Sequence, residues 1–313
     1  MSSLRKLERD FAHADFVAVS ALLAQLGDED VMSRLGLEAR LEELRQRLER
    51  FNEEVSEPTA SASLFFGGRP VVGGRGIESE FAGAAVTRFQ DIVAKVLAHE
   101  TRGLGQRGIV PNKGAATLHI TNIVRGSFGF LLEEVQPHQQ LMGTPLKEAV
   151  DETTRLLDAF GEPDEERFRT AVEVIDQRLL ATTREFFDLL RQSGATLRLV
   201  TDTSDQRFGD EAVARAAERA TSTTVEDADE TIAGQLAGVL PDAHQFEFRT
   251  TDARGTLRGK VDRALTAEQL AQFNRDWVNV DAAARIHIKR VLHKGAVVRE
   301  GFTLLALEAP SQH

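Results

Sequence analysis

Five side chains near the C-terminus could together bind an anion. They are Arg258, Lys260, Arg285, His287 and Lys289, and within two short segments they occupy every second position. Side chains two residues apart lie on the same face of a β-strand. The apolar residues between them would then face a core, and these five would face outward. Such a row could contact the backbone of a nucleic acid or an acidic protein surface.

The charge balance bears on that choice. The formal net charge is −11, so the field of the whole protein repels polyanions. Residues 240–313 differ, because they contain 11 Lys and Arg against 9 Asp and Glu. Proteins that bind single strands normally stack bases on aromatic side chains, but this chain has no Tyr, one Trp and phenylalanines that mostly take inward positions. We therefore expect a protein partner, with a nucleic-acid-associated protein as the alternative.

A glycine-rich stretch, GGRPVVGGRGIESEF at residues 67–81, is a second candidate. It lacks the Lys-Ser/Thr pair of a P-loop and the spacing of a dinucleotide-binding fingerprint. We predict that its glycines only turn the chain, with positive φ at Gly73, Gly74 and Gly76. Anion binding at the following helix start by backbone amides with Arg69 or Arg75 is the alternative left open at residues 67–76.

The stretch Leu118-His119-Ile120-Thr121 has the form of the tetrad found in two-histidine phosphoesterases. Such an enzyme needs two copies. The other apolar-His-apolar stretch centres on His287 and is followed by Lys289 in place of Thr or Ser. A phosphodiester-acting enzyme is therefore the third functional hypothesis, after a protein partner and a nucleic-acid-associated protein. A structural interpretation, in which these residues form an outward polar stripe on a strand, is favoured over it.

Several activities are excluded by what the chain lacks. There is no cysteine, which removes thiol nucleophiles, disulfides and cysteine-based metal sites. Neither His-x-x-x-His nor Gly-x-Ser-x-Gly occurs, so we predict no catalytic residues, no metal site and no cofactor. The acidic run from Glu226 to Glu230 is interpreted as a solvated linker. No stretch approaches the roughly 20 apolar residues of a membrane helix, and we expect a cytoplasmic protein.

Residues 1–55 are predicted to form a helical hairpin. In the second helix, Leu37, Leu41, Leu44 and Leu48 recur at spacings of four and three, which is typical of a packed helix face and predicts self-association. An ordinary solvated hairpin is the alternative. In the first helix, the same spacing predicts a packed face made of Leu4, Leu7, Phe11, Ala14, Ala18 and Ala21.

Residues 59–221 are predicted to form an α+β domain. Strands are expected at the ASLFFGG stretch, at 115–124 and 127–135 around a turn at Arg125-Gly126, and at 195–201. In that hairpin Leu118, Ile120, Phe128, Phe130 and Leu132 are expected to face inward. Helices are expected from Ser79 to His99, from Thr144-Pro145 to Phe160, without interruption from Pro163 to Gly194, and over about 210–220.

Residues 222–313 are predicted to form a small β-barrel. Three strands, a helix and two strands follow one another, which is the order of a five-stranded OB-like barrel and also suits an SH3-like barrel with an inserted turn. The fold class is therefore α+β in three parts. The function we expect is a non-enzymatic cytoplasmic interaction or regulatory protein, which forms a homo-oligomer through its helices and contacts a partner through the barrel, without membrane association.

Overall fold

The computed structural model describes residues 5–26, 30–53, 58–101, 113–124, 128–135, 143–172 and 175–310. The chain divides into two compact units: Met1–Ala171 with Arg178–Ala220, and Val172–Gln177 with Thr221–His313. The first contains most of the helices and a five-stranded sheet, and the second contains a closed five-stranded barrel. The predicted α+β class with a C-terminal barrel is confirmed.

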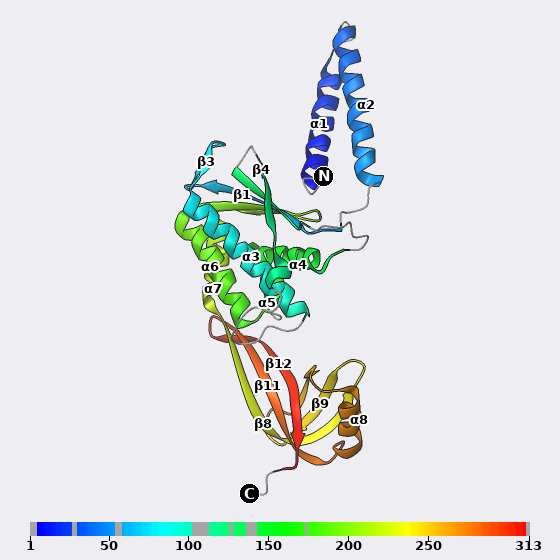
Figure 1. The fold of residues 1–313 in the computed structure, drawn as a ribbon, viewed down its shortest axis with the longest axis vertical. Coiled ribbons are helices and arrows are strands. Elements are labelled where there is room, and N and C mark those ends of the chain that lie inside the picture. Colours follow the sequence, from blue (N-terminus) through cyan, green and yellow to red (C-terminus); the bar gives the residue numbers. More distant parts are fainter. Residues whose placement is uncertain are drawn as a thin grey trace. The chain divides into compact units, whose positions relative to one another are not determined.

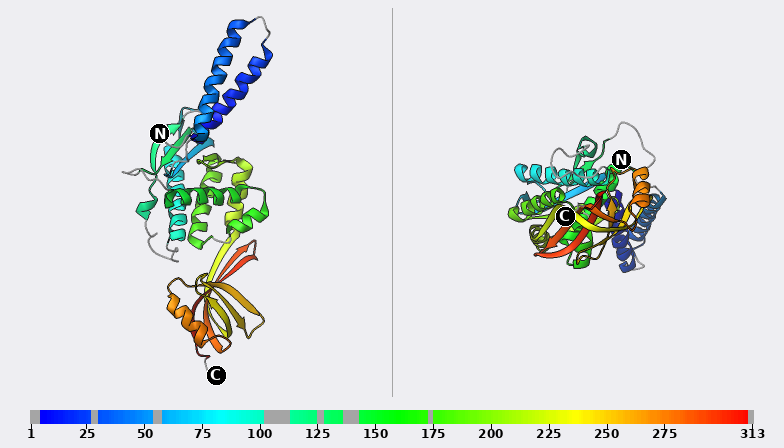
Figure 2. Two further views of the ribbon diagram at one scale, coloured as in Figure 1. Left: turned by 90° about the vertical axis from the view of Figure 1, so that its right-hand side faces the viewer. Right: turned by 90° about the horizontal axis from the view of Figure 1, so that it is seen from below.

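The helical hairpin consists of α1 (Arg5–Gln25) and α2 (Val31–Glu53), which lie side by side in Figures 1 and 2. The predicted face of α1 is confirmed at Leu7, which is 3% exposed, but it is wrong from Phe11 onward, because Phe11 is 66% exposed whereas Ala12 is 2% exposed. Phe16, Val19 and Leu23 continue the covered face from Ala12 at spacings of four and three. The two series differ by one or two residues, and the larger side chains of the second decide the rotation of the helix. Leu4 lies outside the described residues.

The central sheet has the strand order β4-β5-β1-β6-β7, and every neighbouring pair is antiparallel. Its strands are β1 (Ser61–Gly68), β4 (His119–Val124), β5 (Phe128–Glu133), β6 (Ala195–Val200) and β7 (Asp205–Phe208). A two-stranded ribbon, β2 (Val71–Val72) with β3 (Gly76–Ile77), follows β1. Strand β7 was not predicted, since its sequence, DQRF, has no apolar alternation. The turn at Arg125-Gly126 lies outside the described residues.

One predicted inward position of the β4–β5 hairpin is wrong. Ile120 is 54% exposed, while Leu118 and Leu132 are buried. Strand β4 lies at the edge of the sheet, and its side chains from His119 to Ile123 are all exposed. Apolar alternation therefore does not decide burial in this strand, and the sequence does not show that the strand lies at an edge.

Helices pack on the sheet through phenylalanines. The helices are α3 (Ser79–Thr101), α4 (Pro145–Gly161), α5 (Glu165–Val172), α6 (Gln177–Ser193) and α7 (Asp210–Ser222), with a short η1 (Lys113–Ala116). Phe66 of β1 meets Phe81 of α3 edge to face, and Phe187 of α6 packs against Phe208 of β7. On the other face of β1, Phe65 shares a small core with Leu7 of α1 and Val200 of β6.

The predicted uninterrupted helix from Pro163 to Gly194 is wrong, since α5 ends at Val172 and α6 begins at Gln177. The predicted apolar series is nevertheless buried in both helices, as at Phe168, Leu179 and Phe186, and only its last member, Leu189, is half-buried. Apolar spacing therefore predicted the covered face and did not mark the break between the two helices. The other helix starts agree with the prediction, and Thr144 caps α4 by accepting a hydrogen bond from the Lys147 amide at 3.1 Å.

The barrel has the order three strands, one helix, two strands, as predicted. Its elements are β8 (Thr223–Leu240), β9 (Gln245–Thr250), β10 (Thr256–Val261), α8 (Ala267–Asp276), β11 (Asp281–His293) and β12 (Ala296–Glu308). The strands close in the order β10-β12-β11-β8-β9, and the parallel pair β10–β12 completes the ring. Helix α8 has a full capping box at Thr266, so it is a true helix and not an inserted turn. This arrangement fits the OB-like alternative.

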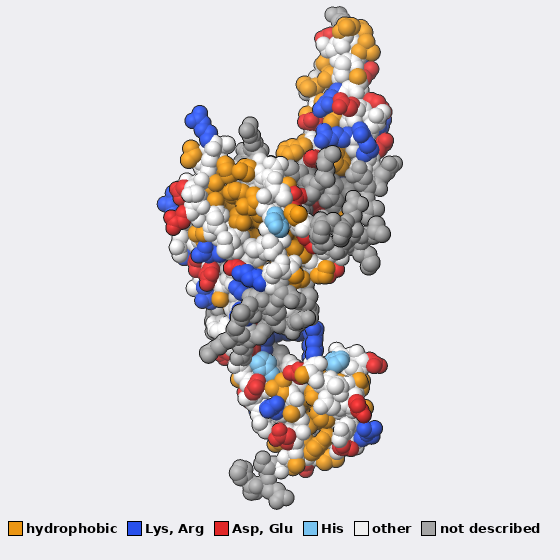
Figure 3. All heavy atoms as spheres, viewed as in Figure 1, with side chains coloured by type: hydrophobic (Ala, Val, Ile, Leu, Met, Phe, Trp, Pro, Cys, Tyr) orange, Lys and Arg blue, Asp and Glu red, His pale blue; other side chains and the backbone are white. Residues whose placement is uncertain are grey.

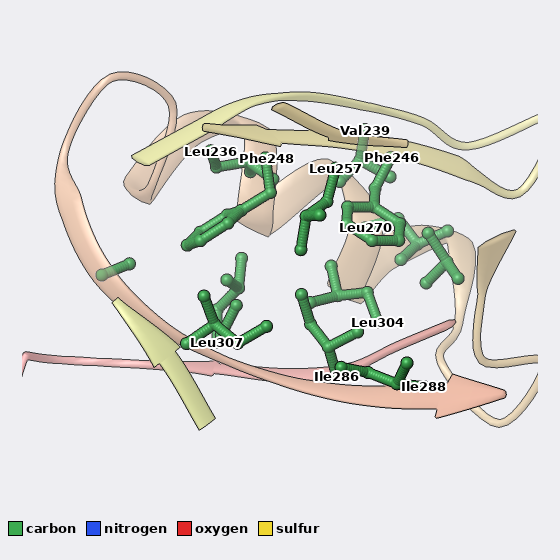
Figure 4. Close-up of a cluster of buried hydrophobic side chains, with 14 residues drawn as sticks. Leu236, Val239, Phe246, Phe248, Leu257, Leu270, Ile286, Ile288, Leu304 and Leu307 are labelled. Atoms are coloured by element: carbon green, nitrogen blue, oxygen red, sulfur yellow. The ribbon is translucent and has the colours of Figure 1, made fainter. Parts of the chain in front are cut away.

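The barrel core is apolar and continuous (Figure 4). Phe248, Ile286 and Leu304 come from three different strands and are fully buried, and Leu270 of α8 is buried in the same cluster. Burial of these side chains fixes which residues of each strand point outward, because strand neighbours alternate between the two faces.

The acidic run interpreted as a linker is instead the first half of β8. Glu226, Asp227 and Asp229 pair in register with Arg290, Lys289 and His287 of β11. The interpretation was wrong because the run pairs with a strand about 60 residues later in the chain, which local composition does not show. Cross-strand pairing of opposite charges stabilises such a ladder.

Candidate anion-binding groove on the barrel

The predicted row of cations divides into two groups with different surroundings. Arg258 and Lys260 lie on β10, whereas Arg285, His287 and Lys289 lie on β11. Strand β12 separates β10 from β11, so the two strands are not neighbours. Lys260 and His287 nevertheless lie in the same cross-strand row, because both pair in register with Thr303 of β12.

The β11 group is largely engaged with acids of β8. The ring of His287 lies between two carboxylates, with Nδ1 at 2.7 Å from Asp229 and Nε2 at 3.3 Å from Asp227. Burial lowers the pKa of Lys289, and Lys260 adds to this effect, while Asp176 and Asp227 act against it. Arg285 is exposed. Two of these three side chains therefore belong to an internal charge ladder.

The β10 group lines a groove with a volume of about 670 Å³. The lining residues come from β8, β9, β10 and β12, and they are Ala237, Gly238, Val239, Leu240, Gln245, Phe246, Glu247, Arg249, Arg258, Gly259, Lys260 and Arg299. Four of them are cations and one is an acid. This local excess of positive charge contrasts with the net charge of −11 of the whole chain, and it concentrates a positive potential in a concave surface.

The register of the strands fixes the arrangement of these cations. Arg249 of β9 pairs with Thr256, and Arg258 of β10 pairs with Glu247. Lys260 pairs with Gln245, which in turn pairs with Leu240 of β8. Arg249, Arg258 and Lys260 are thus successive positions on one outer face.

Three of the groove cations, Arg249, Arg258 and Lys260, have few partners among the described residues. Arg258 reaches Glu247 at 3.3 Å, but its side chain is 77% exposed, and an exposed pair of this kind contributes little. Arg249 and Lys260 make no side-chain hydrogen bond or ion pair with any residue that the structure describes. Cations that the fold does not use are available to a ligand.

Sequence reasoning identified Arg258 and Lys260 but missed Arg249, Leu240 and Arg299. Arg249 could have been predicted, because Phe246 and Phe248 take the inward positions of the same predicted strand and so turn Arg249 outward. Leu240 could also have been predicted, since it pairs with Gln245 in the short β8–β9 hairpin. Arg299 could not, since its place in the groove depends on how β12 pairs with β10, about 40 residues earlier in the chain. Long-range register cannot be obtained from local patterns alone.

The glycine-rich stretch turns the chain, and its arginine has a structural partner. Positive φ occurs at Gly68 (82°) and Gly73 (54°), so the prediction for Gly74 and Gly76 was wrong. Arg69 donates from Nη2 to the carbonyl of Gln192 at 2.7 Å and from Nε to that of Ser193 at 3.2 Å. These bonds cap the last turn of α6, which leaves Arg69 poorly placed to hold an anion. Arg75 is exposed.

The two histidines of the phosphoesterase hypothesis lie on different sheets. His119 is exposed on β4 of the central sheet, and the neighbouring Thr121 donates its hydroxyl to Glu133. His287 is on the barrel and bridges two aspartates. Within the described part of the chain, no group of three or more His, Asp or Glu side chains could hold a metal ion.

The leucines predicted to mediate self-association share one face of α2. Leu44 is 1% exposed, and Leu37, Leu41 and Leu48 are half-buried. Since α1 and α2 pack against each other, this face contributes to the hairpin itself. Outward apolar side chains are present elsewhere on the hairpin, with Met32 81% and Leu35 57% exposed, and Figure 3 shows apolar side chains at its far end.

None of the helices among the described residues is both long enough and apolar enough to cross a membrane. No protein-family model, curated protein or solved structure matches the chain. The function is therefore inferred from the geometry of the groove.

Proposed function

We propose that this is a non-enzymatic interaction protein that binds an acidic protein partner through the groove on its barrel. The observation that carries the proposal is the set of exposed cations, Arg249, Arg258 and Lys260, on one face of β9 and β10. Complementary charge steers association and selects partners. The exposed Leu240 at the groove's edge adds an apolar contact, which an acidic protein can use and a bare phosphate cannot.

A single-stranded nucleic acid is the second candidate. OB-like barrels bind oligonucleotides on the face of their second and third strands, and β9 and β10 hold those positions here. The lining of the groove argues against it, because base stacking needs exposed aromatic rings. Phe246, the one aromatic residue in the described lining, is 4% exposed and belongs to the core.

Salt dependence separates the two candidates. Nucleic-acid binding weakens by about one logarithmic unit per tenfold rise in salt for each phosphate contacted, whereas a protein contact with an apolar part weakens less. Binding of an acidic peptide and of an unstructured oligonucleotide to the full chain should be measured by fluorescence anisotropy across a salt series. We expect the peptide to bind and the oligonucleotide to bind only weakly at physiological salt.

Charge reversal supplies the matched control. The double variant Arg258→Glu with Lys260→Glu should lose peptide binding, while Arg285→Glu, on an exposed site outside the groove lining, should retain it. Melting temperatures of both variants should stay close to that of the parent, since all three side chains are exposed. A sub-micromolar, salt-sensitive oligonucleotide affinity that the double variant abolishes would replace this proposal by the nucleic-acid candidate.

Self-association through the hairpin stays a prediction. The leucine face of α2 is already in use within the hairpin. Association of two hairpins would therefore also require outward residues such as Met32 and Leu35 to take part. Sedimentation equilibrium on the full chain and on Met32→Ser with Leu35→Ser measures this directly. A monomer mass at every concentration of the parent protein would remove assembly from the proposal.

A further inference from the structure

We infer that the groove accepts an extended peptide segment that carries an acidic side chain at every second residue. This inference rests on the proposed function and names the chemistry of the partner. It depends on three features of the groove: the spacing of its cations, the open space above one glycine, and the apolar side chain at its edge.

The cations repeat at the period of a β-strand. Arg258 and Lys260 are two residues apart on β10, which corresponds to about 7 Å at 3.4 Å per residue. Arg249 is the diagonal neighbour of Arg258 across the β9–β10 pair, a separation of about 7 to 8 Å. In an extended peptide, alternate side chains on one face have the same spacing of about 7 Å.

A helical ligand fits this spacing less well. Acidic side chains on one face of a helix are three or four residues apart, with about 5 to 6 Å between their Cβ atoms. Its face also curves away from a sheet, so that fewer carboxylates reach the line from Arg249 to Lys260. An extended segment follows that line throughout its length.

The floor of the groove leaves room for a ligand. Gly238 of β8 pairs in register with Glu247, which pairs with Arg258. A Cβ added at Gly238 would meet no atom within 4 Å, and its φ lies outside the positive region. The space above Gly238 is therefore open, and a larger side chain there would occupy the groove without straining the backbone.

An apolar residue lies at the end of the same cross-strand row as Lys260. Leu240 is 61% exposed and pairs with Gln245, the register partner of Lys260. Leu240 and Lys260 are separated by β9, a distance of about 10 Å at 4.8 Å per strand, so a ligand residue that follows the last acidic side chain reaches Leu240 where the ligand crosses over β9. We expect that position of the peptide to be apolar, since burying Leu240 against it removes apolar surface from water.

Labelled peptides of equal length, equal charge and the same terminal leucine test the inference on the full chain. In one peptide the glutamates occupy every second position, and in the other they occupy every third position, with serines and threonines between them. The first should bind at least about tenfold more tightly, because only its carboxylates can reach successive cations together. An unstructured oligonucleotide serves as the third probe.

A groove-filling variant tests the site without changing its charge. Gly238→Phe should abolish binding of the alternating peptide, and Gly238→Ala should leave most of it, with the melting temperatures of both near that of the parent. Loss of binding in the phenylalanine variant accompanied by loss of fold would be resolved by Gly238→Gln, which fills the same space with a polar side chain.

The outcomes separate this inference from the function on which it rests. Equal affinity for the two peptides, abolished by the charge-reversed double variant, would overturn the alternating spacing and leave the acidic-partner proposal standing. Binding of the oligonucleotide alone, or of none of the probes, would overturn both. Unchanged peptide affinity in Gly238→Phe would show that the peptide does not bind in the groove, and it would overturn the inference.

Discussion

Arginines have opposite roles in the central domain and in the barrel. Arg219 of α7 is 6% exposed, and its Nη1 donates to the carbonyls of Ala159 at 3.0 Å and Glu162 at 2.6 Å. It also lies 4.5 Å from the ring centre of Phe168. Arg249 and Arg258 of the barrel extend into solvent over a groove. Backbone carbonyls hold Arg219 in place, whereas Arg249 and Arg258 donate to no backbone carbonyl among the described residues.

The difference comes from which backbone groups the fold leaves unpaired. The last carbonyls of a helix have no partner within the helix, and the ends of α4 and α6 bring such carbonyls to Arg219 and Arg69. A closed barrel pairs its backbone groups between strands, so arginines on its outer face meet other side chains or solvent. The architecture around an arginine therefore decides its role.

The largest effect is expected from removing Arg219. Arg219→Ala leaves three carbonyls near the end of α4 without their donor and removes the contact with Phe168. We expect a loss of about 3 to 5 kcal/mol in the free energy of unfolding. Urea denaturation measures it. Arg249→Ala is the matched control and should change the same quantity by less than about 0.5 kcal/mol.

Equal losses in the two variants would contradict the division into structural and available arginines. Arg219→Lys sharpens the test, because lysine keeps the charge but lacks the planar fork of donors. It should recover only part of the stability.

Gly68→Ala should have the next largest effect. Gly68 has φ of 82°, and a Cβ there would lie 2.1 Å from the carbonyl oxygen of Gly194. Strain and overlap together should cost roughly 2 to 4 kcal/mol. Gly74→Ala, at a position with open space and ordinary φ, should be close to neutral. If both variants melted alike, the glycines would not be needed for the close approach of β1 to the end of α6.

An ion pair in the central domain offers a pH-dependent comparison with the exposed pairs of the groove. Arg198 donates to both carboxylate oxygens of Asp205 at 2.8 and 2.7 Å. These bonds are the main cause of a lowered pKa for Asp205, against the opposing effect of burial. The pair therefore stabilises the protein above the ordinary carboxyl pKa of 3.8, and this contribution is lost as the pH falls through the lowered value.

Asp205→Asn should cost roughly 1 to 2 kcal/mol at pH 7. Below pH 3.8 the difference between variant and parent should shrink, because the parent also loses the carboxylate there. Unfolding by urea at several pH values measures the difference, and Glu247→Gln in the groove is the control. A difference that stayed constant down to the acid-unfolding range would contradict the assignment to this ion pair.

The sequence predicted the elements better than it predicted their faces. Thr144-Pro145 marked the start of α4, and the barrel order followed from apolar alternation, because caps and alternation are local signals. Local reading misplaced the covered face of α1, and it joined α5 to α6. In α1, contacts with other elements chose between apolar series of similar spacing, whereas the break between α5 and α6 left the apolar spacing intact.

The candidate site divides in the same way. Arg258 and Lys260 were predictable, since alternation around Leu257 and Val261 turns them outward. Pairing of His287 with Asp227 and Asp229 was not, because it joins residues about 60 positions apart through the register of β8 with β11. Alternation in the sequence therefore predicted that Arg258 and Lys260 face solvent. The pairing of the strands showed which cations already have an acidic neighbour.

The smallest effect is expected at Leu240, where the groove combines charge with an apolar edge. Leu240 is already 61% exposed, so Leu240→Ser should leave the unfolding free energy within about 0.5 kcal/mol of the parent. Affinity for the alternating acidic peptide with a terminal leucine should fall by roughly three- to tenfold, in keeping with partial burial of one aliphatic side chain. A peptide with serine at its terminal position should bind parent and variant alike, because the apolar contact is then absent from both complexes. Such a cycle isolates the contact between the two leucines from the charge pairing at Lys260. An equal loss for both peptides would show that Leu240 acts by shaping the groove, and the apolar position inferred for the partner would be withdrawn.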